Sequence, residues 1–98
     1  MPTVLLVEDN PSLQRTLCAL LAPLGYVVTV AATVAGARLL AGVKYDAVLL
    51  DSQLSNGSGH ELASLWPDAN VVTMSGDGES DLNKPFTAVD LVRKLRNS

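Results

Sequence analysis

Short, mainly apolar segments recur along the chain, and a polar residue follows each of them. Thr3–Val7, Tyr45–Leu50 and Val71–Met74 are too short for helices and show no polar alternation, which predicts strands buried on both faces. Tyr26–Ala31 is rich in β-branched residues and predicts another strand. A further short strand is expected to end at Lys84. The pattern therefore predicts five strands.

Segments with apolar residues at helical spacing lie between and after these strands. Asn10 is a typical N-cap, Pro11 a typical first helical residue, and Gly25 a typical stop. Thr33 is expected to cap the second helix, which Gly42 ends. The expected helices run from Pro11 to Leu24, from Val34 to Ala41, from about His60 to Trp66 before Pro67, and onward from a cap at Thr87 with Val89, Leu91, Val92 and Leu95 in the core.

The alternation of buried strands and helices indicates an α/β domain, a parallel sheet with helices wound on both faces. The chain has 98 residues, 48% of them hydrophobic, which fits one domain over residues 1–98. The formal net charge of −3 argues against non-specific nucleic-acid binding. Cys18 is the only cysteine, and no apolar run reaches membrane-spanning length. We therefore expect a cytoplasmic protein without nucleic-acid or membrane partners.

Polar residues with chemical potential follow several of the predicted strands. Glu8 and Asp9 come directly after the first strand, Asp51 after the third and Ser75 after the fourth, while Lys84 ends the expected fifth. In a sheet of parallel strands, active groups gather at the carboxyl ends of the strands. We therefore expect three carboxylates, a hydroxyl and an ammonium group to meet at one edge of the sheet.

These side-chain types fit phosphoryl transfer. Three clustered carboxylates repel each other unless a cation joins them, and an all-oxygen site suits Mg²⁺. One carboxylate is then able to attack phosphorus and form an acyl phosphate. The charge on the transferred group calls for donors around it, and Lys84, Ser75 and the backbone N–H of Gly76 are available.

Four segments contain these polar residues or adjoin them: Val7–Pro11, Leu49–Asp51, Met74–Gly76 and Lys84–Phe86. They resemble the hallmark segments of response-regulator receiver domains, the CheY-like family, and the similarity runs from about Val4 to Leu95. The resemblance implies a flavodoxin-like sheet in the order 2-1-3-4-5 and a role in two-component phosphorelay signalling.

The resemblance also implies a set of metal ligands. Asp51 would be the phospho-acceptor and a ligand of Mg²⁺. Asp9 would bind Mg²⁺ directly and Glu8 through water, and the backbone carbonyl of Gln53 would complete the protein ligands.

The same resemblance implies the groups that receive the phosphoryl group. Lys84 would pair with it, and the bond from Lys84 to Pro85 would be cis. Ser75 would be the switch hydroxyl, with Thr73 as a competitor because it lies on the same strand face at period two. His60 is interpreted as a surface residue rather than a phosphodonor or ligand.

The chain departs from the family in three places. Only eight residues separate Ser75 from Lys84, whereas a parallel crossover normally takes a dozen or more, so we expect the fourth helix to be missing or replaced by a loop. Asp81 stands where receivers generally place an aromatic, and Ser55 where proline is common. A missing helix would leave side chains of Val71–Met74 under-protected, which predicts a docked partner or a homodimer at that place.

The leading hypothesis is a phosphorylation-dependent switch rather than an enzyme, with catalysis limited to its own aspartyl phosphorylation and dephosphorylation. It would receive phosphate from a histidine kinase or phosphotransfer protein and signal by protein–protein interaction. The alternative is a pseudo-receiver, an interaction module that keeps the fold without the switch. An aspartyl phosphatase would need a second acid two residues after the nucleophile, where Gln53 stands, which argues against that reading.

Overall fold

The computed structural model describes residues 2–51, 53–54, 57–58, 62, 64–75, 82–83 and 88–96. Strands and helices alternate along this part of the chain, as the sequence pattern predicts. The elements are β1 (Thr3–Val7), α1 (Pro11–Leu21), η1 (Ala22–Leu24), β2 (Val27–Ala31), α2 (Val34–Arg38), β3 (Ala47–Asp51), β4 (Gln53–Leu54), β5 (Gly57–Ser58), β6 (Asn70–Ser75), β7 (Leu82–Asn83) and α3 (Ala88–Arg96).

The main sheet has five strands in the order β2-β1-β3-β6-β7, and every neighbouring pair is parallel. Numbered among themselves, these strands follow the order 2-1-3-4-5. The predicted fold class and strand order are therefore confirmed. β1 and β3 lie inside the sheet, which explains their apolar runs Val4–Val7 and Ala47–Leu50.

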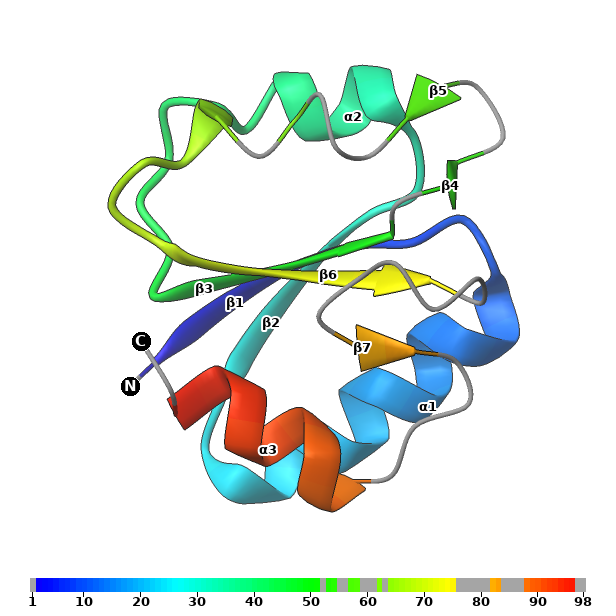
Figure 1. The fold of residues 1–98 in the computed structure, drawn as a ribbon, viewed down its shortest axis with the longest axis vertical. Coiled ribbons are helices and arrows are strands. Elements are labelled where there is room, and N and C mark those ends of the chain that lie inside the picture. Colours follow the sequence, from blue (N-terminus) through cyan, green and yellow to red (C-terminus); the bar gives the residue numbers. More distant parts are fainter. Residues whose placement is uncertain are drawn as a thin grey trace.

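Helices cover both faces of this sheet (Figure 1). Leu17 and Leu21 of α1, together with Leu91 and Leu95 of α3, pack on one face. Ala37 of α2 and, further along the chain, Leu62 and Trp66 pack on the other face. Successive residues of a strand alternate between these two clusters, because strand side chains have a period of two.

The first helix begins and ends where the sequence predicts. The side chain of Asn10 accepts hydrogen bonds from the backbone N–H groups of Ser12 and Leu13, at 2.9 and 3.3 Å. Regular α-helix stops at Leu21, and the 3₁₀ turn η1 carries the chain to Gly25, whose φ of 91° suits a residue without a side chain.

The second helix is shorter than predicted. Its Thr33 cap is confirmed, since the hydroxyl accepts from the N–H of Gly36 at 2.9 Å, but the α-helix ends at Arg38 rather than continuing to Ala41. Beyond it the backbone closes in tighter i to i+3 turns, such as the bond from Leu40 N–H to the carbonyl of Ala37. The indole N–H of Trp66 donates to the Leu40 carbonyl at 3.2 Å, so a distant residue fixes this turn.

The segment after β3 contains more structure than the expected Gly/Ser-rich loop. Gln53–Leu54 and Gly57–Ser58 form a small antiparallel pair. Of the helix expected from about His60 to Trp66, the structure describes a 3₁₀ conformation at Leu62, Ser64 and Leu65.

The expectation of under-protected β6 side chains is wrong for Val72 and Met74. They are 2% and 0% exposed, because they face α1 and α3 rather than the side where a fourth helix would pack. Val71 and Thr73 on the other face are half-buried. The expected absence of a fourth helix concerns residues 76–81 and lies outside the described residues, as does the Thr87 cap.

The last helix is tied to the start of β6. The side-chain amide of Asn70 donates to the carbonyls of Lys94 and Leu95, at 2.9 and 3.3 Å. These carbonyls belong to the final turn of α3. The last carbonyls of an α-helix lack backbone N–H donors from a following turn, so the Asn70 amide satisfies them instead. None of the helices in the described part of the chain has the length and apolarity that a membrane crossing requires.

Candidate functional site

Three acidic side chains converge at the carboxyl end of the sheet. Glu8, Asp9 and Asp51 each offer a carboxylate oxygen, and these oxygens all lie within 4.8 Å of one another. Glu8 is only 1% exposed and Asp51 4%, whereas Asp9 is half-buried. The structure thus brings together the acids that the sequence pattern placed at two different strand ends.

Strand pairing accounts for this convergence. β1 and β3 run parallel side by side, and their last paired residues are Val7 and Leu50. The next residues along are Glu8 and Asp51, so the register itself places one acid beside the other. Asp9 extends the acidic edge by one residue at the start of the loop to α1.

Hydrogen bonds hold the short loop from Glu8 to Asn10. The N–H of Glu8 donates to the carbonyl of Ala31 on β2 at 3.1 Å. The N–H of Asn10 donates to the Glu8 side-chain oxygen Oε1, also at 3.1 Å. The side-chain amide of Gln14 donates to the Glu8 carbonyl. Sequence reasoning missed Gln14; the only signal was its position in the first turn of a helix that starts beside the acids.

The cluster has the chemistry of a site for a hard cation. Its donors are all carboxylate oxygens, and two of the three groups are almost completely buried. Buried like charges so close together raise each other's electrostatic energy, and a divalent cation removes that cost. Such cations prefer oxygen ligands.

For the remaining predicted site residues, the structure describes either the backbone alone or no position at all. Ser75 is the last residue of β6 and follows Met74, which pairs with Asp51; Thr73 pairs with Leu50, further from the strand end. Gln53 begins β4, two residues after the acid. The side chains of Ser75 and Gln53 lie outside the described part of the structure. Lys84, the Lys84–Pro85 bond, His60, Ser55 and Asp81 also lie outside the described residues.

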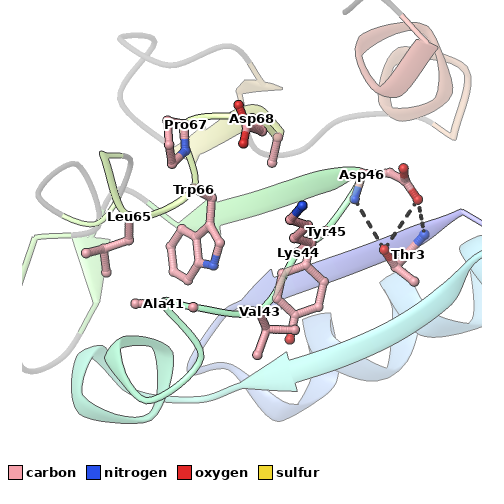
Figure 2. A pocket seen from close by; sticks show the side chains of 12 residues that line it. Thr3, Ala41, Val43, Lys44, Tyr45, Asp46, Leu65, Trp66, Pro67 and Asp68 are labelled. Carbon is pink, nitrogen blue, oxygen red and sulfur yellow. Dashed lines mark hydrogen bonds between the residues drawn. The ribbon is translucent and has the colours of Figure 1, made fainter.

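A cleft of about 400 Å³ lies at the opposite end of the sheet, where β1 and β3 begin (Figure 2). Thr3, Lys44, Asp46, Trp66 and Asp68 are among its lining residues. The Asp46 carboxylate already accepts from the Thr3 backbone N–H at 2.7 Å and from the Thr3 hydroxyl at 3.3 Å. This carboxylate therefore links the starts of β1 and β3, which is a structural role. For this reason the acidic cluster, rather than this cleft, is the candidate site.

Comparison with known proteins identifies the family of this chain. The family model described as response regulator receiver domain matches residues 4–96. The chain belongs to this family. Hybrid signal transduction histidine kinase D of Dictyostelium discoideum is 30% identical over 115 residues, which cover 98% of this chain. The chain spans only 7% of the length of that relative.

Solved receiver structures superpose closely on this receiver domain. A response regulator from Burkholderia pseudomallei, with a phosphorylated aspartic acid and a calcium ion, is 27% identical with a TM-score of 0.86, covering 99% of this chain and 68% of the other. The receiver domain of sensor histidine kinase PA1611 from Pseudomonas aeruginosa, with a magnesium ion coordinated in its active-site cleft, is 28% identical with a TM-score of 0.83, covering 97% and 94%. A CheY-like receiver from Methanospirillum hungatei, 23% identical with a TM-score of 0.87, covering 98% and 91%, agrees in fold.

Membership places the chain in two-component phosphorelay signalling. Receiver domains are generally signalling modules rather than classical enzymes. The candidate site of this receiver is the acidic cluster at the carboxyl ends of β1 and β3.

Proposed function

We propose that this receiver accepts a phosphoryl group on Asp51 with the help of Mg²⁺. The observation that carries the proposal is the convergence of Glu8, Asp9 and Asp51, with carboxylate oxygens within 4.8 Å of one another. The phosphorylated aspartic acid in the Burkholderia relative and the magnesium ion in the Pseudomonas receiver support it. We further propose that this receiver itself catalyses the phosphorylation and dephosphorylation of Asp51, with the donor supplying the phosphoryl group.

The chemistry divides among residues of the chain. A carboxylate oxygen of Asp51 attacks phosphorus, and an O–P bond forms as the bond from phosphorus to the donor breaks. The leaving atom keeps the electron pair; it is an imidazole nitrogen when the donor is a phosphohistidine and an acyl oxygen when the donor is acetyl phosphate. Asp9 would hold the metal directly, Glu8 through water, and Gln53 with its backbone carbonyl. Mg²⁺, when bound, neutralises charge on the phosphoryl oxygens.

Two further residues would act on the transferred group. Lys84 pairs with the phosphoryl oxygens, following the end of β7 beside β6. Ser75 donates its hydroxyl as the switch residue. Its place at the end of β6, one residue beyond the partner of Asp51, favours it over Thr73, which lies two residues further back.

The proposed partners are a histidine kinase or a phosphotransfer protein as the donor, and another protein as the receiver of the signal. The relationship to a hybrid histidine kinase supports the first. A homodimer stays a prediction: Val71 and Thr73, on the sheet face where a fourth helix would pack, are half-buried. Sedimentation of a monomer, with and without beryllofluoride, would exclude it. The cytoplasmic location stays a prediction that cell fractionation would test.

The alternative is a pseudo-receiver, an interaction module that does not switch on phosphorylation. The acidic cluster argues against it, since a module that only binds partners has no need to bury two neighbouring carboxylates.

Incubation with acetyl phosphate and Mg²⁺, followed by intact-protein mass spectrometry, tests the proposal. We expect one phosphoryl group on the wild-type chain and on Asp68→Asn, a control acid that is exposed and outside the cluster. We expect none on Asp51→Asn or in excess EDTA. Incorporation that persists in Asp51→Asn would overturn the assignment, and no incorporation on the wild-type chain would favour the pseudo-receiver.

A further inference from the structure

A side chain of the first helix, that of Gln14, is hydrogen-bonded to the backbone of the loop that carries Glu8 and Asp9. The amide Nε2 of Gln14 lies 2.5 Å from the carbonyl oxygen of Glu8 and donates to it. The backbone N–H of the same residue donates to the carbonyl of Asn10 at 3.0 Å. Gln14 therefore binds the loop on both sides of Asp9.

This arrangement fixes the peptide group between Glu8 and Asp9. The carbonyl that accepts the hydrogen bond belongs to that peptide, so the bond sets the orientation of the peptide plane from which Asp9 continues. The Glu8 side chain is separately held by the N–H of Asn10. Asp9 itself is only half-buried, so burial holds its side chain less tightly than those of Glu8 and Asp51.

Electrostatic repulsion acts against this geometry. Three carboxylates within 4.8 Å of one another favour any movement that separates them, and Asp9, on a loop rather than a strand, is the acid best able to move. A hydrogen bond from helix α1 to the loop backbone resists that movement. The donor is an uncharged amide, so it neither competes with a bound cation nor adds a fourth negative charge.

We propose that Gln14 is a positioning residue for metal binding: its hydrogen bond to the Glu8 carbonyl holds Asp9 in the ligand geometry before the cation arrives. This inference rests on the proposed function, because it assigns Gln14 a role in the same Mg²⁺ site. Groups that orient metal ligands are typically worth about 10- to 100-fold in metal affinity. Since Gln14 acts through the backbone of one ligand, we expect the lower end, about 10-fold.

The test compares Gln14→Met, which keeps the length of the side chain without its donor, with the wild-type chain. Thr16→Ala is the matched control, because it removes another side-chain-to-backbone hydrogen bond of α1, the 3.0 Å bond from the Thr16 hydroxyl to the Ser12 carbonyl. Mg²⁺ titrations followed by amide NMR shifts give the dissociation constant. We expect it to rise about 10-fold in Gln14→Met and to stay within about twofold of wild type in Thr16→Ala.

Two further measurements separate positioning from a purely structural role. At saturating Mg²⁺, the rate of phosphorylation by acetyl phosphate should return to within about twofold of wild type, because excess metal compensates for weaker binding. In metal-free protein, the ¹³C shift of the Glu8 carbonyl should change in Gln14→Met and not in Thr16→Ala. A loss of helix packing alone would lower the rate at all Mg²⁺ concentrations.

The outcomes distinguish this inference from the function on which it rests. A wild-type chain that binds no Mg²⁺ in an Asp51-dependent way would overturn both. Normal wild-type binding with an unchanged dissociation constant in Gln14→Met would overturn the role of Gln14 alone. Gln14→Ala, which retains high helix propensity, is measured in parallel so that a folding defect of one variant does not decide the result.

Discussion

Replacing Asp9 by Asn should stabilise the metal-free protein while removing its response to Mg²⁺. The substitution keeps the size of the side chain and removes one of three negative charges whose oxygens lie within 4.8 Å of one another. In the absence of a cation this relieves repulsion with both Glu8 and Asp51. In the presence of a cation it removes a ligand.

The magnitude follows from the geometry. Asp9 takes part in two charge pairs. For each pair at 4.8 Å, Coulomb's law gives about 0.9 kcal/mol at the permittivity of water and about 3.5 kcal/mol at an effective permittivity of about 20, so about 1.7 to 7 kcal/mol for both pairs together. Asp9 is half-buried and has other electrostatic or hydrogen-bonding interactions, which place the net effect between these limits. We expect the free energy of unfolding to rise by about 2 kcal/mol, which raises Tm by roughly 8–16 °C in a domain of this size.

Urea unfolding in EDTA, followed by circular dichroism and by Trp66 fluorescence, measures this difference. Trp66 is buried in the core opposite α1 and reports loss of tertiary packing. Asp68→Asn is the control, since it removes an exposed acid outside the cluster and should change stability by less than about 0.5 kcal/mol. Repeating the series with Mg²⁺ should stabilise wild type according to ligand linkage and leave Asp9→Asn unchanged.

The reasoning fails if Asp9→Asn is no more stable than Asp68→Asn in EDTA. That result would mean that the cluster carries little net repulsion, because protons or neighbouring groups already compensate it. It would also remove the electrostatic argument for a bound cation.

Three other changes test the packing and the caps that support the site. Asn70→Ala should lower the free energy of unfolding by about 1–2 kcal/mol, because the carbonyl of Lys94 loses its hydrogen-bond donor. Backbone amide hydrogen exchange should become faster in α3 than in the other elements. Leu17→Ala should cost about 3 kcal/mol in urea unfolding, and a loss below 1 kcal/mol would contradict its place in the core. Thr33→Ala should cost about 1 kcal/mol, with Thr33→Ser close to wild type, because the hydroxyl caps Gly36.

The sequence by itself determined the order and type of the elements and the residues of the acidic edge. The apolar runs Val4–Val7 and Ala47–Leu50 have few alternatives to buried parallel strands, and the Asn10 and Thr33 caps are local interactions between neighbours in the chain. Because parallel strands end at a common edge, the positions of Glu8, Asp9 and Asp51 along the chain were enough to predict that they meet.

Tertiary structure decided what depends on contacts between distant residues. The second helix ends early where the Trp66 indole donates to the Leu40 carbonyl, 26 positions away in sequence. Val72 and Met74 are covered because the strand's alternation turns them toward α1 and α3, which no local pattern reveals. The hydrogen bond from the Gln14 side chain to the Glu8 carbonyl likewise depends on how α1 is oriented relative to the sheet. Hydrogen bonds between residues distant in sequence, and the burial of side chains between elements, depend on how the elements pack. Helix caps and the apolar sequences of strands depend on residues adjacent in the chain.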